Sequence, residues 1–210
     1  MPRAEPLSSG EPRLRVDALV SPHGGPFSVT VDAHECVAIV GRSGSGKSVL
    51  LRLIADLDPH DGEVWLEGGA RSSWPAPEWR RRVVYQAAEP AWWASTARAH
   101  FAPASLALVD ALLSNLGLDN ALMDSDITRL STGERQRMAL VRSLACEPCV
   151  LLLDEPTAAL DQASTLAVEA LLAARLAAGL SVVFVTHSRE QAERIGHRLL
   201  EVRDHQIHAP

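Results

Sequence analysis

The chain has 210 residues, of which 47% are hydrophobic and 22% are charged, and its formal net charge at pH 7 is −6. A chain of this length forms one domain, with room for a modest insertion, and it can bury a core without disulfides or metal ions. The negative net charge argues against a nucleic-acid-binding protein, which usually presents a basic face, and three cysteines are too few for a secreted disulfide framework.

The beginning of the chain, residues 1–12, is polar and contains several Pro and Gly residues. We expect a disordered leader there, followed by one domain over residues 13–210. The leader lacks the apolar stretch of a signal peptide, and no apolar run in the sequence is long enough to cross a bilayer. We therefore expect a cytoplasmic protein that reaches a membrane only through a partner.

Short strands are predicted between residues 14 and 40. Phe27, Val29 and Val31 alternate with polar residues, which is the period of a half-buried strand. Residues 36–40 form a continuous apolar run, as in a parallel strand that is buried on both faces. The apolar residues of 49–54 then predict a helix, so that the glycine-rich segment between them connects a strand to a helix.

That connecting segment is the first candidate site. It reads Gly41, Arg42, Ser43, Gly44, Ser45, Gly46, Lys47 and Ser48, and it fits the pattern G-x-x-x-x-G-K-[ST]. The glycines let successive backbone N–H groups converge on phosphate oxygens, and the helix that continues through Val49 adds its positive end. We expect Lys47 to reach the β- and γ-phosphates and the Ser48 hydroxyl to bind Mg²⁺. A glycine-rich turn without a ligand is the alternative, but the strand–loop–helix context favours a phosphate site.

The rest of the chain alternates strands with helices. Apolar runs predict strands at 64–66, 83–85, 150–153, 181–185 and 199–202. Helices are predicted at 166–178, where Gly179 follows as a stop signal, and near 190–195. This alternation predicts an α/β fold with a mostly parallel sheet covered on both faces. The stretch 87–142 interrupts it, and we expect an inserted short helical subdomain there, with residues 87–128 mostly helical.

The strand at 150–153 ends in two carboxylates, Asp154 and Glu155. Asp154 is placed to hold Mg²⁺ through a water molecule, and Glu155 can activate the water that attacks a phosphate. Two acids at the end of a strand can also be no more than a solvated strand end. Together with the phosphate loop they predict a nucleoside triphosphatase, a class that contains many families.

Four further motifs resemble those of ABC transporter ATPases, in the order that this family has them. Residues 130–137 resemble the family's signature sequence, and Gln86 follows a strand as its Q-loop glutamine does. Residues 158–161 match the D-loop, and Thr186–His187 match the switch histidine. The resemblance covers Leu14–Ile207. It implies the phosphate-loop fold of this family, with an antiparallel β part at the N-terminus beside the mostly parallel sheet.

The resemblance implies a role for each matched residue. Gln86 would contact Mg²⁺ and the attacking water, and His187 would hydrogen-bond the γ-phosphate and position that water. Ser131 and Gly133 would bind the γ-phosphate of ATP held by a second copy of the chain, and Asp161 would cross the same interface. The implied assembly is a homodimer with ATP between its subunits, bound to a transmembrane permease on the cytosolic face of the membrane.

Two features of the sequence depart from the family's motifs. Residues 20–26 contain no Tyr, Phe or Trp to stack on adenine; His23 or Phe27 could do so, although Phe27 fits better as a core residue. In the signature, Thr132 stands where the family has glycine and Glu134 where it has glutamine. We expect some backbone strain at Thr132 and a negative charge close to the site at Glu134.

The helical subdomain is also compact, because Ser131 follows Gln86 by only 45 positions. This form resembles ATP-binding subunits proposed to export metal ions such as iron. Trp92 and Trp93 lie shortly after Gln86, where the family receives a helix of the membrane subunit. They can anchor that helix or fill the core of the subdomain, and the sequence does not separate the two.

The sequence therefore predicts the ATPase subunit of a transporter, with ATP and Mg²⁺ as ligands and no nucleic acid as a partner. One alternative is a soluble ABC ATPase that acts without a membrane partner, but such proteins usually carry two ATPase halves or a long coiled coil. Another is a nucleotide sensor with little turnover. The complete set of acid, glutamine and histidine positions argues against it.

Overall fold

The computed structural model describes residues 11–209, so most of the expected leader, residues 1–10, lies outside the described residues. The smaller of its two sheets contains β1 (Leu14–Ser21), β2 (Gly24–Val31), β4 (Asp61–Leu66) and β5 (Gly69–Ala70). The larger sheet contains β3 (Cys36–Val40), β6 (Val83–Gln86), β7 (Val150–Asp154), β8 (Ser181–Val185), β9 (Arg198–Arg203) and β10 (Gln206–His208). The helices are α1 (Lys47–Ile54), α2 (Ala76–Arg82), α3 (Leu106–Asn115), α4 (Thr132–Leu144), α5 (Gln162–Ala177) and α6 (Arg189–Ile195).

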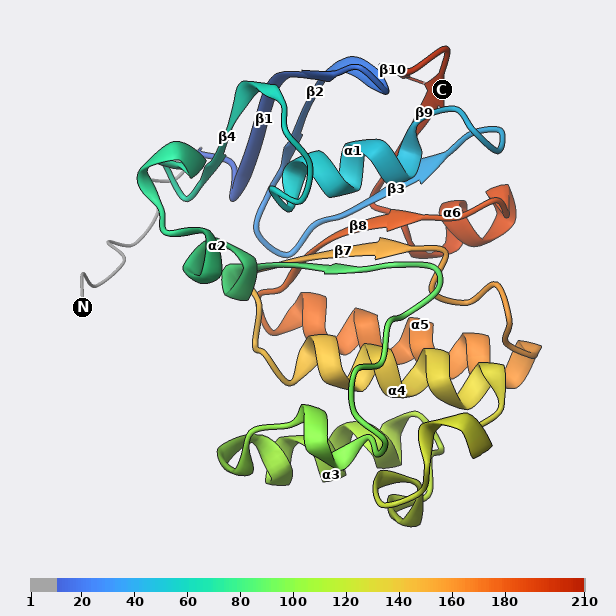
Figure 1. Ribbon diagram of the computed structural model, residues 1–210. Coiled ribbons are helices and arrows are strands. Elements are labelled where there is room, and N and C mark those ends of the chain that lie inside the picture. Colours follow the sequence, from blue (N-terminus) through green and yellow to red (C-terminus); the bar gives the residue numbers. More distant parts are fainter. Residues whose placement is uncertain (1–10, 210) are drawn as a thin grey trace.

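The two sheets lie in separate layers (Figure 1). The larger sheet has the order β10-β9-β3-β8-β7-β6 and is parallel except for β10, and the smaller sheet is antiparallel with the order β2-β1-β4-β5. Helix α1 lies between the sheets, α4 and α5 cover the other face of the larger sheet, and α3 lies beyond them (Figure 1). The predicted α/β fold, with a mostly parallel sheet and an N-terminal antiparallel part, is confirmed.

The buried strands explain their continuous apolar runs. In β7, Val150 and Leu152 belong to the core shared with α1 and the smaller sheet, whereas Leu151 and Leu153 belong to the core shared with α3, α4 and α5. All four side chains are fully buried. A strand covered on both faces needs apolar residues at every position, and this is why no alternation is visible in its sequence.

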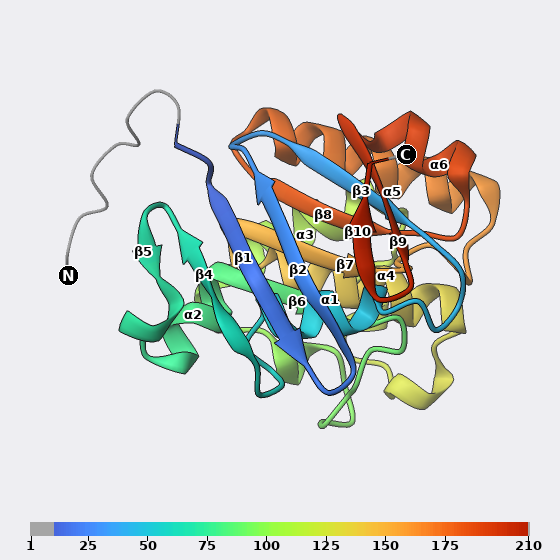
Figure 2. The same ribbon diagram turned by 90° about the horizontal axis from the view of Figure 1, so that it is seen from above.

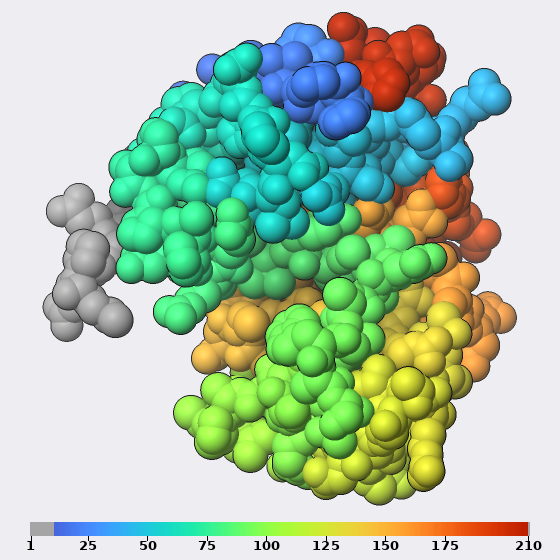
Figure 3. Space-filling model, in the orientation of Figure 1, coloured from blue at the N-terminus to red at the C-terminus, as the bar shows by residue number. Residues whose placement is uncertain are grey.

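The stretch 87–128, expected to be mostly helical, contains a single α-helix, α3, and this expectation was wrong. The remainder is loop and short 3-10 turns, at residues 98–100, 103–105, 120–123 and 127–129. Asp119 and Asp126 start two of these turns, because their carboxylates accept hydrogen bonds from the backbone N–H groups two residues on. Seen from outside, the segment that contains α3 and α4 forms one end of the molecule (Figure 3).

Two other boundaries differ from the prediction. Helix α5 begins at Gln162 rather than at Leu166, because Asp161 caps it and accepts a hydrogen bond of 2.7 Å from the N–H group of Ser164. Strand β10 was not predicted; it pairs with β9 through a tight turn at Asp204 and His205, both with positive φ. Among residues 11–209 there is no helix with the length and hydrophobicity needed to cross a bilayer.

Candidate functional site

The phosphate loop connects the C-terminal end of β3, in the larger sheet, to the N-terminus of α1. Gly41 has a φ of 151°, and a Cβ atom there would lie 2.3 Å from the carbonyl oxygen of Val202 in β9. Gly46 has a φ of 106° and occupies the N-cap of α1. Only glycine combines these conformations with such close approach, so the sequence pattern and the backbone agree. The loop borders a cavity of about 170 Å³. Its lining residues are Ser43, Gly44, Gly46, Lys47, Ser48, Val49, Glu155, His187 and His205.

The Lys47 side chain curls back into the loop and is only 5% exposed. Its ammonium group donates hydrogen bonds to the carbonyl oxygens of Gly41, at 2.8 Å, and of Arg42, at 2.9 Å. Burial lowers the pKa of Lys47, and the nearby carboxylates of Glu155 and Asp154 oppose that shift. The amine therefore sits inside the loop, beside the acids at the end of β7.

The acids at the end of β7 have different surroundings. Asp154 is buried and accepts a hydrogen bond of 3.1 Å from the hydroxyl of Tyr85, whose pKa is raised by burial and by this carboxylate. Glu155 has left-handed backbone, with a φ of 48°, and its N–H group donates to the carbonyl oxygen of Val185 at 3.0 Å. Its Oε1 atom lies 2.5 Å from Nε2 of His187. The structure thus joins two residues that are 32 positions apart in the sequence.

Two polar side chains near the loop are buried without a partner among the described residues. Neither amide atom of Gln86, which is 3% exposed, makes a hydrogen bond, and the Oγ atom of Ser45 makes none. Such groups are costly unless a ligand or water satisfies them. The oxygens of Gln86, Asp154 and Ser48 are hard donors of the kind that Mg²⁺ binds, so these residues fit the ion.

The signature segment begins α4. Ser131 is its N-cap, and it forms a capping box with Glu134: the Ser131 N–H group donates to Glu134 Oε2 at 2.8 Å, and the Glu134 N–H group donates to Ser131 Oγ at 3.2 Å. The negative charge of Glu134 is therefore engaged at the helix end. Thr132 is the first helical residue and is not in the left-handed region, so the expected strain is absent there. A Cβ atom on Gly133 would lie 3.3 Å from Leu160 Cδ2, which shows how closely the two segments pack.

Gln136 is a site residue that the sequence reasoning missed. It is buried in α4, its Nε2 atom donates to the carbonyl oxygen of Glu155 at 2.8 Å, and its Oε1 atom accepts from the N–H group of Ala159 at 3.2 Å. It thus holds the backbone at both ends of the segment from Glu155 to Ala159. The one signal in the sequence was its position one helical turn before the buried Leu140, on the inward face of α4.

The site residues from the signature and the D-loop do not reach the phosphate loop of the same chain. Ser131 and Asp161 are exposed, and neither they nor Gly133 line the cavity beside Lys47. Asp161 caps α5, and its hydrogen bonds with Ser164 lower the pKa of its carboxyl group. Within one chain, residues 11–209 therefore bring together the loop, the acids and His187, and leave the signature apart.

The other end of the cavity lacks the two rings considered for base stacking. Phe27 is fully buried, as expected for a core residue. His23 lies near Asp58, beyond the C-terminal end of α1: the hydrogen bond from Arg52 lowers the pKa of Asp58, and His23 adds to that shift. His205, from the turn between β9 and β10, lines the cavity instead. Nothing in the sequence around His205 pointed to it.

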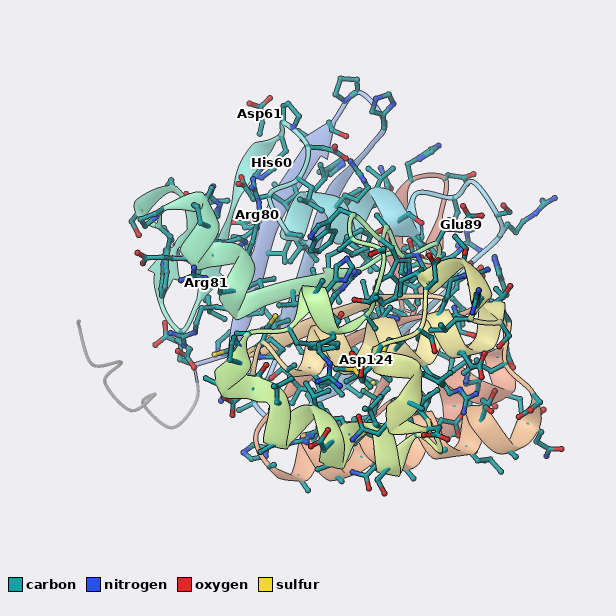
Figure 4. All side chains as sticks on the ribbon, turned by 60° about the horizontal axis from the view of Figure 1, so that its bottom comes forward. His60, Asp61, Arg80, Arg81, Glu89 and Asp124 are labelled. Atoms are coloured by element: carbon teal, nitrogen blue, oxygen red, sulfur yellow. The ribbon has the colours of Figure 1, made fainter. Side chains whose placement is uncertain are left out.

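The sequence left two roles open for Trp92 and Trp93, a place in the core or an anchor for a partner helix. The structure places the two rings in different surroundings. Trp92 packs against the core below the larger sheet, while Trp93 is 73% exposed. The guanidinium of Arg142 lies over both rings, at 4.4 and 4.9 Å from their centroids. Trp92 and Glu89 both line a groove on the loop after β6. Glu89 is labelled in Figure 4.

Comparisons with known proteins find one family and its ATP-binding subunits. A family model described as ABC transporter matches residues 25–158. Protein STAR1 of Oryza sativa subsp. japonica is 40% identical over 169 residues, which cover 76% of this chain and 49% of that protein. The cobalt import ATP-binding protein CbiO of Rhodobacter capsulatus is 38% identical over 188 residues, covering 82% of this chain and 67% of its own length. The chain thus spans from about half to about two thirds of these two relatives.

Further matches support the same relationship. The phosphate import ATP-binding protein PstB 2 of Natronomonas pharaonis is 34% identical over 205 residues, covering 86% of this chain and 71% of that protein. A solved ATP-binding subunit of an ABC transporter superposes with a TM-score of 0.85 at 22% identity, covering 93% of this chain and 88% of the other. A dimeric bacterial ABC transporter cassette gives 0.79 at 23% identity, covering 92% and 96%. At these identities the two structures establish the likeness of the fold.

Proposed function

Because this chain belongs to the ABC transporter family, we propose that it binds and hydrolyses ATP and that the cycle powers transport through a separate transmembrane permease. The observation that carries the proposal is the pairing of Glu155 with His187 across 2.5 Å at the cavity of the phosphate loop. A carboxylate general base, a histidine and a buried lysine in one cavity suit the transfer of a phosphoryl group to water.

The residues act in a sequence that their positions suggest. The loop N–H groups and Lys47 hold the β- and γ-phosphates, and His187 hydrogen-bonds the γ-phosphate. Glu155 accepts a proton from the attacking water while the oxygen of that water forms a bond to the γ-phosphorus. The bond from that phosphorus to the β–γ bridging oxygen breaks, and ADP and phosphate leave. Ser48, Gln86 and Asp154 would hold Mg²⁺, which neutralises charge on the phosphate oxygens.

The position of the signature supports a homodimer as the working unit. Ser131 is exposed at the N-terminus of α4 and lies outside the lining of the chain's own cavity. We propose that Ser131 and Gly133 bind the γ-phosphate held by a second copy, and that Asp161 lies at the same interface. A helix N-terminus is suited to an anion, and a site divided between subunits couples hydrolysis to their closure.

The exposed ring of Trp93 supports the proposal of a membrane partner. We propose that residues 87–142 act as a helical subdomain, and that Trp93, held by Arg142, anchors a helix of the permease on the cytoplasmic face of the membrane. The relatives are named for different cargoes, cobalt and phosphate, and we propose that the permease sets the cargo of this chain. In its narrower form, the proposal is that the cargo is a metal ion such as iron.

The substitution Glu155→Gln tests the mechanism. Turnover of ATP with Mg²⁺ should fall by about a hundredfold or more, because the amide cannot accept the proton, while ATP binding persists and an ATP-bound dimer accumulates. Steady-state phosphate release and size-exclusion chromatography measure these effects. Glu193→Gln, which changes an exposed carboxylate on α6, is the matched control.

The outcomes separate the competing functions. Wild-type turnover in Glu155→Gln would contradict the mechanism. The absence of turnover in the unchanged chain, with ATP still bound, would favour the nucleotide sensor. Co-purification with ribosomes or DNA in place of a membrane protein would favour the soluble ATPase.

A further inference from the structure

The turn between β9 and β10 reaches the mouth of the phosphate-loop cavity. The N–H group of Gly25 donates to the carbonyl oxygen of His205 at 3.0 Å, which attaches this turn to the connection between β1 and β2. The His205 ring lies over the start of α1, because a Cβ atom on Gly46 would be 3.1 Å from its Nδ1 atom, and one on Gly24 would be 3.3 Å from it. Figure 2 shows the hairpin at the edge of the larger sheet.

The strand order places His205 at the opposite end of the cavity from Glu155, the proposed general base. The phosphate loop follows β3, whose neighbour on one side is β8, leading to His187, with β7 and Glu155 beyond it. Its neighbour on the other side is β9, leading to His205. A triphosphate with its γ-phosphate at Glu155 and His187 therefore runs along the loop towards β9. Its nucleoside would then lie on the side of His205.

The other rings near the cavity are committed elsewhere. Phe27 is fully buried beneath Gly24 and Gly46, and the ring of His187 is paired with Glu155. Of the residues that line the cavity, His187 and His205 are the two that carry rings. His205 is exposed, so one face of its ring is open to a ligand.

We propose that His205 stacks on the base of the bound nucleoside triphosphate and sets the affinity of this chain for the nucleoside. The inference rests on the proposed binding of ATP and goes beyond it, since it assigns the nucleoside to the hairpin β9–β10. Every base has a flat π-face, and stacking on a planar side chain commonly changes affinity by about tenfold.

Calorimetric titration of the full chain with ADP and with inorganic pyrophosphate, both in the presence of Mg²⁺, tests the proposal. Pyrophosphate occupies the loop without a base. His205→Gly and His205→Asn suit this position, because both residues tolerate its φ of 59°. Both variants should bind ADP about tenfold more weakly and pyrophosphate as the wild type does. His205→Tyr should restore ADP binding, and His208→Gln on the same hairpin should leave both affinities unchanged.

Three results would overturn the assignment. The first is unchanged ADP affinity in His205→Gly. The second is an equal loss for ADP and pyrophosphate, because that would mean that the turn only supports the loop. The third is a loss specific to ADP in His23→Asn and absent in His205→Gly. If the unchanged chain bound neither ATP nor ADP, the proposed function would fail as well, whereas a loss confined to the His205 variants leaves it intact.

Discussion

Individual residues of the site adopt backbone conformations that most side chains resist. Glu155 is left-handed, at a cost of about 1–2 kcal/mol for a residue other than glycine. Hydrogen bonds from its N–H group to Val185 and from Gln136 to its carbonyl oxygen offset that cost. With this conformation the carboxylate lies 2.5 Å from His187, so the strain serves the position that we propose for the general base.

Gly41 lacks room for a side chain, whereas Gly44 has room and only a left-handed backbone. Alanine substitutions separate these two effects. Gly41→Ala should lower the free energy of unfolding by about 3 kcal/mol, because its Cβ atom would collide with the Val202 carbonyl oxygen. Gly44→Ala should cost only about 1 kcal/mol, because its φ is 77° but no atom lies within 4 Å of the new Cβ. Urea unfolding followed by circular dichroism measures both, and equal losses would contradict the close approach of β9.

At the scale of the elements, a buried polar cluster joins α5 and α6 to the site. Gln191 of α6 donates to Glu169 of α5 at 2.9 Å, and it accepts from the hydroxyl of Thr186, beside His187, at 2.9 Å. Arg194 donates to both carboxylate oxygens of Glu169, at 2.7 Å each. The cluster therefore connects α5 and α6 to the end of β8, which His187 follows.

This cluster should make the protein sensitive to acid. The hydrogen bonds from Arg194, with help from Gln191, lower the pKa of Glu169 below its ordinary value of 4.5. The unfolded chain therefore binds the proton first, and the stability that the ionised Glu169 contributes above about pH 5 is lost as the pH falls through its folded-state pKa.

Glu169→Gln tests this origin of acid sensitivity. The variant should be less stable near neutral pH and should lose less of its remaining stability between about pH 5 and pH 3. Urea midpoints across this range provide the measurement, with Glu193→Gln as the control for an exposed carboxylate on α6. An acid dependence identical to that of the wild type would place the effect elsewhere.

At the scale of the whole molecule, the phosphate loop and the signature lie on different parts of one chain. Lys47 lines the cavity and Ser131 does not, so the proposed active site needs two copies. The capping box also ties Ser131 to the stability of α4, and its substitution costs about 1 kcal/mol for the lost cap alone. A test of the shared site must therefore separate folding from function.

Mixing two inactive variants makes that separation. Lys47→Ala and Ser131→Arg should each abolish ATP turnover alone, the first by removing the phosphate contact and the second by blocking the partner's site. Their mixture should recover measurable activity, because a mixed dimer contains one site with intact Lys47 and Ser131. Phosphate release before and after mixing is the measurement, and thermal denaturation checks that each variant is folded. A mixture with no activity would contradict a site shared in this way.

Contiguous stretches of the sequence determined the parts of this protein that depend on local backbone geometry. The glycines of residues 41–46 define the loop, and the apolar run 150–153 predicts a strand buried on both faces, because these patterns concern neighbours along the chain. The family's motifs supplied the candidate roles of Gln86 and His187.

The tertiary structure decided which distant residues meet. It placed His205 over Gly46, joined Gln136 to the backbone of Glu155, and kept Ser131 away from the cavity beside Lys47. It also replaced much of the helix expected over residues 87–128 with loop and short turns, and in two turns after α3 side-chain hydrogen bonds compete with the helix. The physical reason is that periodicity records only which side of an element is buried, whereas contacts between elements depend on the order of the strands and on how the sheets and helices pack.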